Sequence, residues 1–260
     1  MQLKERVAVV TGAGSGIGAA AARRLAREGA RVALLGRTEE DLNGVAAGIR
    51  GQGHEALPLA VDIVEAEALE RGYGQVIDRW GRLDIVFANA GVNGVWAPIE
   101  ELSPEEWRST VDINLNGTFL TLKYAVPYLR ERGGSIIVTS SVNGTRMFSN
   151  TGATAYACTK GAQVVLGRML ALELAKHRIR VNVVCPGAVE TDLDEHTDDR
   201  DTSLMRDPRA VPDDAIPLTD DRPASAEDVA ELVLFLASDA SGHVTGTEIW
   251  IDGGQSLLKG

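Results

Sequence analysis

The stretch RVAVVTGAGSGIG, Arg6 to Gly18, decides the fold of this chain. A run of β-branched and small apolar residues, typical of a buried strand, leads into a glycine-rich segment, and an alanine-rich helical segment follows. Gly12 permits a sharp turn, and the missing side chains from Gly14 to Gly18 let a phosphate group approach the helix amino terminus. The spacing is GxxxGxG rather than GxGxxG, and no GK[ST] follows, which disfavours a nucleoside triphosphatase. The stretch therefore predicts a strand–turn–helix unit that binds phosphate.

The rest of the chain continues this alternation of strand and helix. Seven runs rich in β-branched residues are nearly continuously apolar, as strands covered on both faces are. They span residues 6–11, 31–36, 55–61, 83–89, 135–141, 180–186 and 247–252. Helical periodicity between them predicts an α/β fold, a Rossmann-type doubly wound sheet of seven mainly parallel strands flanked by helices on both faces. Since no repeat or low-complexity linker divides the sequence, residues 1–260 are predicted to form one domain.

The composition excludes several classes of protein. Apolar residues make up 44% of the 260 residues and charged residues 24%, as in a globular protein with a substantial core. The formal net charge of −11 disfavours nucleic acid and anionic lipid as partners. No apolar stretch approaches a membrane span and no signal peptide is evident, so we expect a cytoplasmic protein. Cys158 and Cys185 are interpreted as small buried hydrophobic residues, and no metal site is expected.

One segment departs from this composition. Residues 191–223 are acidic, contain prolines and are poor in branched apolar residues. Such a segment is either a solvated connection or a lid beside a ligand. The lid is the stronger interpretation, because the segment follows the carboxyl end of a predicted strand, where open parallel sheets bind ligands.

Further motifs follow the glycine stretch in a definite order. They are Asp62 after the third predicted strand, Asn89-Ala90-Gly91 after the fourth, Asn114 within a predicted helix, Ser141, YACTK from Tyr156 to Lys160, Pro186-Gly187 and a terminal TGTEIWIDGG. With this ordered set the chain, from Val7 to about Gly254, resembles the short-chain dehydrogenase/reductase family. The resemblance implies an NAD(P)-dependent oxidoreductase that interconverts a ketone and a secondary alcohol by hydride transfer.

The resemblance also implies which residues form the site. The catalytic set would be Asn114, Ser141, Tyr156 and Lys160. The cofactor-binding set would be Gly12, Ser15, Gly16, Ile17, Gly18, Arg37, Asp62, Ile63, Asn89, Ala90, Gly91, Tyr156, Lys160, Pro186, Gly187, Val189 and Thr191.

Tyr156 and Lys160 lie four residues apart on a predicted helix, so both project from one face. A buried ammonium beside a phenol favours the phenolate and lowers the phenol pKa below its free value of about 10. Tyr156 is then suited to protonate a carbonyl oxygen in reduction and to take the alcohol proton in oxidation. Spacing alone favours a core tyrosine beside a snorkelling lysine. The resemblance assigns the acid/base role to Tyr156.

Ser141 ends a predicted strand, where its hydroxyl can hold the substrate oxygen against Tyr156. The adjacent Ser140 is an alternative, and Ser141 is preferred because it occupies the family's position. Asn114, with Asn116 as a nearby competitor, would support a water chain between the lysine and solvent.

Two other positions are assigned by the resemblance alone. Asp62 would receive the adenine amino group and Asn89 would stabilise the central strands, whereas both would otherwise be ordinary turn residues. A serine nucleophile is disfavoured because no G-x-S-x-G elbow occurs. The four histidines are expected on the surface or in loops; they are His54, His177, His196 and His243.

The end of the second predicted strand indicates the cofactor. An NAD site usually places a carboxylate there, but this strand ends at Gly36 and Arg37 follows. The Arg37 guanidinium suits the 2′-phosphate of NADP, although it could instead pair with Glu39 or Glu40 on the surface. Ser15 is neutral where many NADP-preferring relatives carry a basic residue. The sequence therefore predicts NADP(H) over NAD(H).

Substrate contacts would come from residues 93–96, residues 143–154 and the segment from Val189 onward. Four large apolar residues, Trp96, Val142, Met147 and Phe148, suggest an apolar pocket for a small-molecule ketone or alcohol, although Met147 and Phe148 could also pack beneath a loop.

Two alternative functions remain. One is a 3-oxoacyl-acyl-carrier-protein reductase, disfavoured by Leu172-Glu173 where such a reductase often has arginine, although Arg130 and Arg132 could supply part of a basic patch. The other is a non-catalytic cofactor-binding module. It is disfavoured because such a module would have no chemical reason to keep all four residues of the catalytic set. The resemblance further implies a homotetramer built on the helix that carries Tyr156 and on the carboxy-terminal segment.

Overall fold

The computed structural model describes residues 1–191, 197–200 and 215–259. A seven-stranded sheet with the order β3-β2-β1-β4-β6-β7-β9 lies at its centre, and every strand pair is parallel. Its strands are β1 (Val7–Thr11), β2 (Arg31–Gly36), β3 (Ala56–Ala60), β4 (Ile85–Ala88), β6 (Gly134–Thr139), β7 (Ile179–Pro186) and β9 (Glu248–Ile251). All seven predicted strands and the doubly wound α/β architecture are confirmed.

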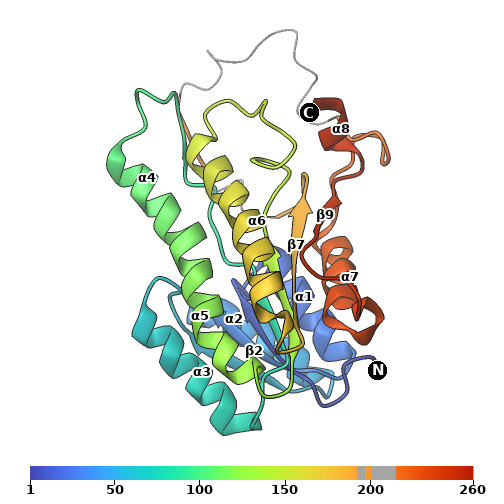
Figure 1. The fold of residues 1–260 in the computed structure, drawn as a ribbon. Helices are drawn as coiled ribbons and strands as arrows, with labels where there is room; N and C mark the ends of the chain where they lie inside the picture. The colour runs from blue at the N-terminus through green and yellow to red at the C-terminus, as the bar shows by residue number, and fades with distance from the viewer. Residues whose placement is uncertain (192–196, 201–214, 260) are drawn as a thin grey trace.

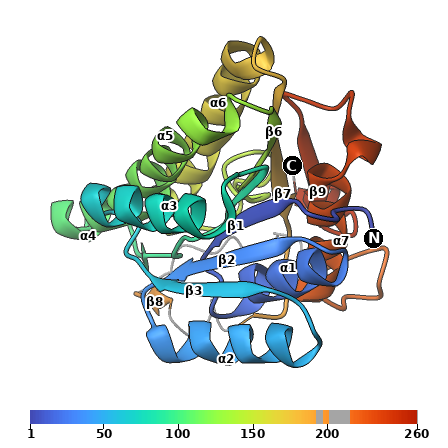
Figure 2. The same ribbon diagram turned by 90° about the horizontal axis from the view of Figure 1, so that it is seen from below.

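Helices cover both faces of this sheet (Figures 1 and 2). On one face lie α1 (Gly16–Arg27), α2 (Glu39–Gly51) and α7 (Ala226–Ala237). On the other lie α3 (Ala66–Trp80), α5 (Gly117–Leu129) and α6 (Thr154–Ala175). The remaining helical segments among the described residues are α4 (Pro104–Val111), a π-helical turn (Asp112–Asn116), a 3₁₀ turn (Asp239–Ser241) and α8 (Gln255–Lys259).

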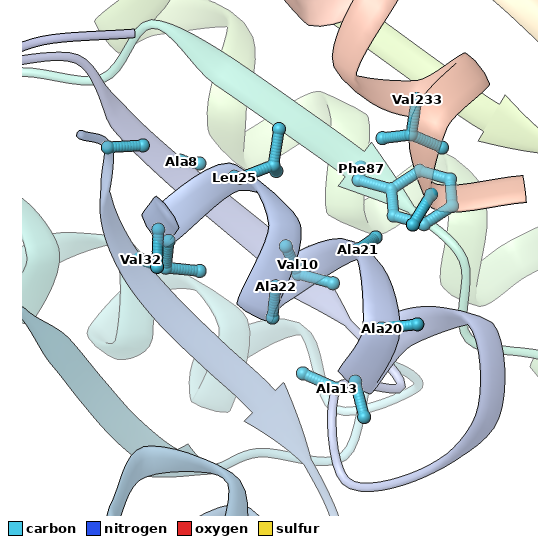
Figure 3. Packing of buried hydrophobic residues seen from close by; sticks show 14 of the residues in the cluster. Ala8, Val10, Ala13, Ala20, Ala21, Ala22, Leu25, Val32, Phe87 and Val233 are labelled. Atoms are coloured by element: carbon cyan, nitrogen blue, oxygen red, sulfur yellow. The ribbon is translucent and has the colours of Figure 1, made fainter. Parts of the chain in front are cut away.

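The core has two halves, one on each face of the sheet. Successive strand residues point to opposite faces, so Ala8 and Val10 pack toward α1 while Val7 and Val9 pack toward the other helices. Figure 3 shows the alanine-rich turn of α1 lying against β1, with Phe87 of β4 and Val233 of α7 beside it. Burial on both faces explains the continuous apolar character of the strands.

The strand order places a switch point beside β1. The chain runs outward from β1 to β2 and β3, and then returns to the other side of β1 with β4. In open parallel sheets ligands bind at the carboxyl ends of the strands near such a point. We call this end of the sheet, toward which β7 points in Figure 1, the carboxyl edge, and the opposite end the amino edge.

A second, two-stranded sheet was not predicted. Here β5 (Val95–Trp96) pairs in parallel with β8 (Asp198–Asp199). Each strand has two residues, which is too short for a hydrophobic period to be recognised in the sequence.

Two predictions about single residues need correction or refinement. The interpretation of both cysteines as buried is wrong for Cys158, which is exposed on α6, whereas Cys185 is buried in β7. Periodicity did not distinguish the outer face of α6 from its inner face, because α6 is apolar on both. Asn114 was predicted within an ordinary helix and instead lies in the π-helical turn that joins α4 to α5.

None of the helices in the described part of the chain combines the length and apolar character needed to cross a membrane. The same residues contain no cluster of three or more His, Cys, Asp or Glu side chains that could hold a metal ion. His54, His177 and His243 are at least partly exposed and lie outside the helices and strands, as predicted, and His196 lies outside the described residues.

Candidate active site

The glycine loop after β1 is locked to the loop after β4. Gly12 has a φ of +63°, and a Cβ on Gly18 would overlap the Gly12 carbonyl oxygen. The Thr11 hydroxyl accepts hydrogen bonds from the backbone N–H groups of Asn89 and Ala90, at 3.0 and 3.1 Å. The loop backbone and the amino end of α1 are therefore packed to a spacing that side chains would prevent.

Asn89 joins three neighbouring strands. Its side-chain amide donates to the Thr11 carbonyl oxygen of β1 at 3.3 Å, and its side-chain oxygen accepts from the Thr139 hydroxyl of β6 at 3.1 Å. Because Asn89 itself follows β4, one carboxamide fixes the relative positions of β1, β4 and β6 at their carboxyl ends.

The amino terminus of α1 is suited to a phosphate group. Ser15 is the N-cap residue with extended backbone, its side chain makes no capping hydrogen bond, and the first turn contains no acidic residue. Backbone N–H groups of the first turn lack partners within the helix, and the helix dipole adds positive potential there. The segment after β7 also reaches this loop, because a Cβ on Gly16 would lie 3.2 Å from the Thr191 methyl carbon.

Arg37 lies exposed directly after β2. It makes no ion pair with Glu39 or Glu40, and its guanidinium has no hydrogen-bond acceptor among the described residues. The first turn of α2 packs over the glycine loop, since a Cβ on Gly14 would lie 2.9 Å from the Asp41 Cβ. Arg37 therefore lies at the carboxyl edge, and its pairing with the 2′-phosphate of NADP stays a prediction.

The other proposed cofactor residues occupy the same edge of the sheet. The Asp62 side chain accepts a hydrogen bond from the Val64 backbone at 3.2 Å, and the Ile63 side chain is buried in the core against Gly117. After Pro186, a Cβ on Gly187 would lie 2.7 Å from the Asp252 Cβ, and Val189 forms a β-bridge with Ala224. The Ile63 side chain is thus a packing group.

Lys160 is buried beneath the predicted catalytic tyrosine. Its ammonium is 4% exposed, donates to the Thr139 carbonyl oxygen at 3.0 Å and lies 5.4 Å from the centre of the Tyr156 ring. Burial lowers the pKa of Lys160 to about 8, because removal from water disfavours the charged form. The helix thus brings a buried titratable amine next to a phenol, as the spacing predicted.

The two neighbouring serines are used differently. The Ser140 hydroxyl donates to the Lys160 carbonyl oxygen at 2.8 Å and so ties β6 to α6. The Ser141 hydroxyl oxygen accepts from the Asn143 backbone at 3.1 Å, which leaves its own proton for another acceptor. This difference favours Ser141 over Ser140 as the residue that contacts a substrate.

Asn114 is fully buried, and its hydrogen bonds are made within the protein. The carboxamide accepts from the Val92 backbone at 2.8 Å and donates to the Val92 carbonyl at 2.9 Å and to the Thr159 hydroxyl at 3.1 Å. Its backbone carbonyl accepts from Gln163 at 2.7 Å and from Thr118 at 2.6 Å. Asn114 therefore fixes the loop after β4 against α6, and the π-helical turn directs it there.

A cavity of about 630 Å³ lies beside α6. Its wall is formed by residues 97, 99, 143, 144, 147, 148, 150–154, 157, 158, 161 and 162. No charged side chain is among these residues. Of the four apolar residues predicted for the pocket, Met147 and Phe148 belong to the wall, whereas Trp96 and Val142 do not. The side-chain oxygens of Asn143 and Asn150 are buried and, within the described residues, accept no hydrogen bond. The cavity is suited to an uncharged molecule that carries a hydrogen-bond donor.

Part of the predicted lid lies next to this region. Within the described residues 197–200, β8 pairs with β5, which contains Trp96. The centre of the Trp96 ring lies 6.5 Å from the centre of the Tyr156 ring. The Arg200 guanidinium holds the segment to α4 through Glu106 at 2.6 Å, and this pair lowers the pKa of Glu106 to about 2. The remainder of the proposed lid, residues 192–196 and 201–214, lies outside the described residues.

Sequence reasoning missed two features of the site. The unpartnered carboxamides of Asn143 and Asn150 carry no signal in the sequence, because both residues read as loop asparagines. The role of Trp96 in holding residues 197–200 beside Tyr156 depends on a pairing between segments about a hundred residues apart.

Comparison with known proteins adds independent information. Residues 12–256 match a sequence family described as enoyl-(acyl carrier protein) reductase. The chain is 38% identical over 255 residues to the cis-4-hydroxycyclohexanecarboxylate dehydrogenase of Sinomonas cyclohexanicum, covering 98% of each chain. It is similar to the crystal structure of a 3-ketoacyl-ACP reductase from Sinorhizobium meliloti 1021, with 51% identity and a TM-score of 0.92 over 97% of this chain and 99% of that one. It is also similar to carveol dehydrogenase from Mycobacterium avium in complex with NAD, with 33% identity and a TM-score of 0.88 over 98% and 99% of the chains.

Proposed function

The chain belongs to the short-chain dehydrogenase/reductase family, and on this premise we propose that Tyr156 is the acid/base of its reaction and NADP(H) its preferred cofactor. The chain is an oxidoreductase that interconverts a ketone and an alcohol with a nicotinamide cofactor. The observation that carries the residue assignment is the buried Lys160 ammonium, 5.4 Å from the centre of the Tyr156 ring.

The residues present fit a dinucleotide. The glycine loop is a cradle that side chains would fill, and unpartnered N–H groups at the amino end of α1 suit its pyrophosphate. The nicotinamide supplies hydride to a ketone carbon or accepts it from an alcohol carbon. Ser141 positions the substrate oxygen with its free hydroxyl proton, and Tyr156 donates a proton to that oxygen in reduction and takes it back in oxidation.

Lys160 and Asn114 support the tyrosine in different ways. The Lys160 ammonium favours the phenolate form of Tyr156 by its charge. Asn114 acts as a positioning residue, because its carboxamide bonds to Val92 and Thr159 rather than to open space. These contacts support a holding role, and the water chain that the resemblance implied stays a prediction.

The preference for NADP(H) rests on Gly36 and Arg37. No carboxylate ends β2 to repel a 2′-phosphate, and the exposed Arg37 guanidinium has no acceptor within the described residues. The carveol dehydrogenase of Mycobacterium avium, whose structure contains NAD, is 33% identical to this chain. We propose that Arg37 pairs with the 2′-phosphate and that Asp62 and Thr191 complete the cofactor site.

The substrate is proposed to occupy the uncharged cavity beside α6. The uncharged wall favours a ketone or secondary alcohol without an ionised tail. The two carboxamide oxygens that accept no hydrogen bond within the described residues favour a substrate that also carries a hydroxyl or N–H group. Residues 191–223 are proposed as a lid, supported by the position of residues 197–200 beside Trp96. No nucleic acid or membrane is proposed as a partner.

A second candidate function is reduction of 3-oxoacyl groups on an acyl carrier protein. Similarity to the Sinorhizobium reductase favours it. Against it, Arg130 and Arg132 follow the end of α5 and precede β6, so they lie toward the amino edge, away from the cavity. Leu172, where a basic residue was sought, is 85% exposed and apolar.

Exposed apolar side chains support a homotetramer. Phe119 of α5 and Val165, Met169 and Leu172 of α6 are large, apolar and exposed in the single chain. Contiguous apolar residues of this kind mark protein interfaces. A cytoplasmic setting is supported by two cysteines that form no disulfide.

The test is a cofactor and substrate screen on the purified protein. Absorbance at the reduced-nicotinamide band is followed with NADPH or NADH and a panel of uncharged cyclic ketones, aliphatic ketones and a 3-oxoacyl-carrier thioester. We expect uncharged ketones to be reduced with a higher kcat/KM for NADPH, and Arg37→Ala to raise the KM for NADPH about tenfold while leaving that for NADH unchanged. A clear preference for NADH would exclude the cofactor assignment, and selective use of the thioester would establish the second candidate.

A further inference from the structure

A second cavity, of about 190 Å³, lies at the amino edge of the sheet, opposite the proposed active site. Four neighbouring strands begin around it, because its wall includes residues just before β1 and at the starts of β4, β6 and β7. The end of α7 closes it. The wall consists of Arg6, Asp84, Ile85, Arg132, Gly134, Ser135, Arg178, Arg180, Ala237 and Asp239, and we call it the arginine cavity.

The charge of this cavity contrasts with that of the whole chain. The protein carries a net charge of −11, yet four arginines and only two aspartates line the cavity, and a fifth arginine, Arg82, pairs with one of those aspartates. Such a concentration of one charge in a small space is unfavourable unless counter-charges are present.

The two aspartates are already used. Asp84 is buried and accepts from the Val7 backbone at 2.8 Å and from Arg82 at 2.8 and 2.6 Å, with Arg6 3.6 Å away. The second guanidinium nitrogen of Arg6 donates to Asp239 at 3.3 and 3.4 Å. Asp84 and Asp239 therefore balance Arg82 and Arg6, and the other arginines of the cavity form no ion pair with a carboxylate of the described residues.

Three guanidinium groups form no ion pair within the described residues, and Asp239 acts on Arg180 only through its charge at longer range. Arg180 donates one nitrogen to the carbonyls of Leu236 and Ser238, at 2.8 and 3.2 Å, while its other terminal nitrogen is buried and has no acceptor. Arg132 and Arg178 are exposed and make no side-chain hydrogen bond or ion pair. A buried guanidinium nitrogen without an acceptor is costly and points to a missing oxygen ligand.

We propose that the arginine cavity binds a phosphate-sized oxyanion held by Arg132, Arg178 and Arg180. Guanidinium groups pair with the oxygens of phosphate through parallel N–H···O bonds, and three of them around one cavity match a tetrahedral dianion. A volume of about 190 Å³ accommodates phosphate or the terminal phosphate of a larger ligand but not a whole dinucleotide. The site is separate from the glycine loop, because the two lie at opposite ends of β1.

The experiment measures the effect of inorganic phosphate on the thermal stability of the full chain, in potassium chloride of matched ionic strength. A ligand that binds only the native state raises the Tm in a concentration-dependent way. We expect phosphate to raise the Tm of the parent, and Arg132→Gln and Arg178→Gln each to weaken binding at least about tenfold. Both side chains are exposed, so these variants are expected to fold.

Arg23→Gln is the matched control, because it removes an exposed arginine of α1 that lines neither cavity and forms no ion pair within the described residues. It should retain the parent response. Arg37→Gln reports on phosphate bound at the proposed cofactor site. If Arg37→Gln loses the response while Arg132→Gln and Arg178→Gln keep it, phosphate binds only at the glycine loop and the proposal is wrong. An equal Tm increase with chloride alone, or none with phosphate, would also overturn it.

Phenyl phosphate distinguishes the source of the anion. Binding as tight as that of inorganic phosphate, with the same dependence on Arg178, identifies a site for the phosphate end of a larger molecule. Binding of inorganic phosphate alone identifies a closed site for the free ion. Either pattern supports the oxyanion site, and neither depends on the proposed catalytic activity.

Discussion

The two ends of the central sheet are built from opposite kinds of polar group. At the carboxyl edge lie buried hydroxyls, carboxamides and one lysine, together with a cavity whose wall carries no charged side chain. Glycines allow close backbone approach there. At the amino edge, arginines and aspartates form ion pairs around a small polar cavity. In the proposed function, the groups at the carboxyl edge hold a ligand and move a proton, whereas the ion pairs at the amino edge join the starts of neighbouring strands. Substitutions at the two edges should therefore affect different measurements.

The largest effect is expected for Tyr156→Phe at the carboxyl edge. Removing the hydroxyl that donates and accepts the proton should lower kcat by about 10²- to 10⁴-fold, without loss of stability. Steady-state turnover of a ketone from the screen and a thermal melt measure both quantities. The matched control is Tyr73→Phe, which removes a buried hydroxyl without a partner in α3 and should leave kcat unchanged. Parent-like turnover by Tyr156→Phe would refute the proposed mechanism.

Asp84→Asn should produce the reverse pattern at the amino edge. It removes the charge that balances Arg82 and Arg6 at a buried position, which should lower the free energy of unfolding by about 2–3 kcal/mol. Denaturant titration measures the loss, and kcat should stay within twofold of the parent. Asp239→Asn, at a side chain that is 89% exposed, is the control and should change stability by less than about 0.5 kcal/mol. A fall in kcat of more than twofold, measured on folded Asp84→Asn, would contradict the separation of roles between the two edges.

Gly18→Ala tests the close packing of the glycine loop. The added methyl group overlaps the Gly12 carbonyl oxygen, so the loop must shift at a cost of about 1–3 kcal/mol, and the KM for NADPH should rise about tenfold or more. The control is Gly44→Ala in α2, where a Cβ meets no neighbour within 4 Å and should stabilise the helix slightly. Equal cofactor KM values for the two variants would argue against a phosphate site in this loop.

Lys160 gives a prediction for the dependence of stability on pH. Its pKa is lowered by burial to about 8, whereas a lysine in the unfolded chain titrates near 10.4. Between these values the unfolded chain binds one proton more than the native protein, so stability rises with pH. The free energy of unfolding of the parent relative to Lys160→Met should increase by about 1 kcal/mol per pH unit from pH 8 to pH 10. A constant difference from pH 7 to pH 10 would show that the lysine is not buried as described.

The smallest effect concerns Cys158, which lies in the wall of the carboxyl-edge cavity. A maleimide should label this exposed thiol alone, because Cys185 is buried and its pKa is raised to about 12 by burial. A bound uncharged ketone should slow the labelling several-fold, as mass spectrometry over time would record. Cys158→Ser should prevent labelling and keep turnover. Labelling that is insensitive to every substrate of the enzyme would place the substrate elsewhere.

Much of the architecture was predictable from local pattern. Strands such as VAVVT are apolar at every position because both faces are covered, and the alternation with helices restricts the sheet to parallel order. The order of motifs from the glycine stretch to Lys160 indicated the family. The four-residue spacing of Tyr156 and Lys160 placed both on one helix face.

Other properties arise only where distant segments meet. The sequence by itself determined the elements, their parallel order, the tight glycine loop and the residue types available for chemistry, since these follow from periodicities of 2 and 3.6 residues and from the freedom of glycine. Tertiary structure decided that the Ser140 hydroxyl donates to α6, whereas the Ser141 hydroxyl only accepts a hydrogen bond within the described residues. It also decided that Asn114 bonds to Val92 and Thr159 and that Cys158 is exposed. It also gathered Arg132, Arg178 and Arg180 at one edge. Burial, hydrogen-bond partners and local charge depend on which segments pack together, and no period within a single segment records that packing.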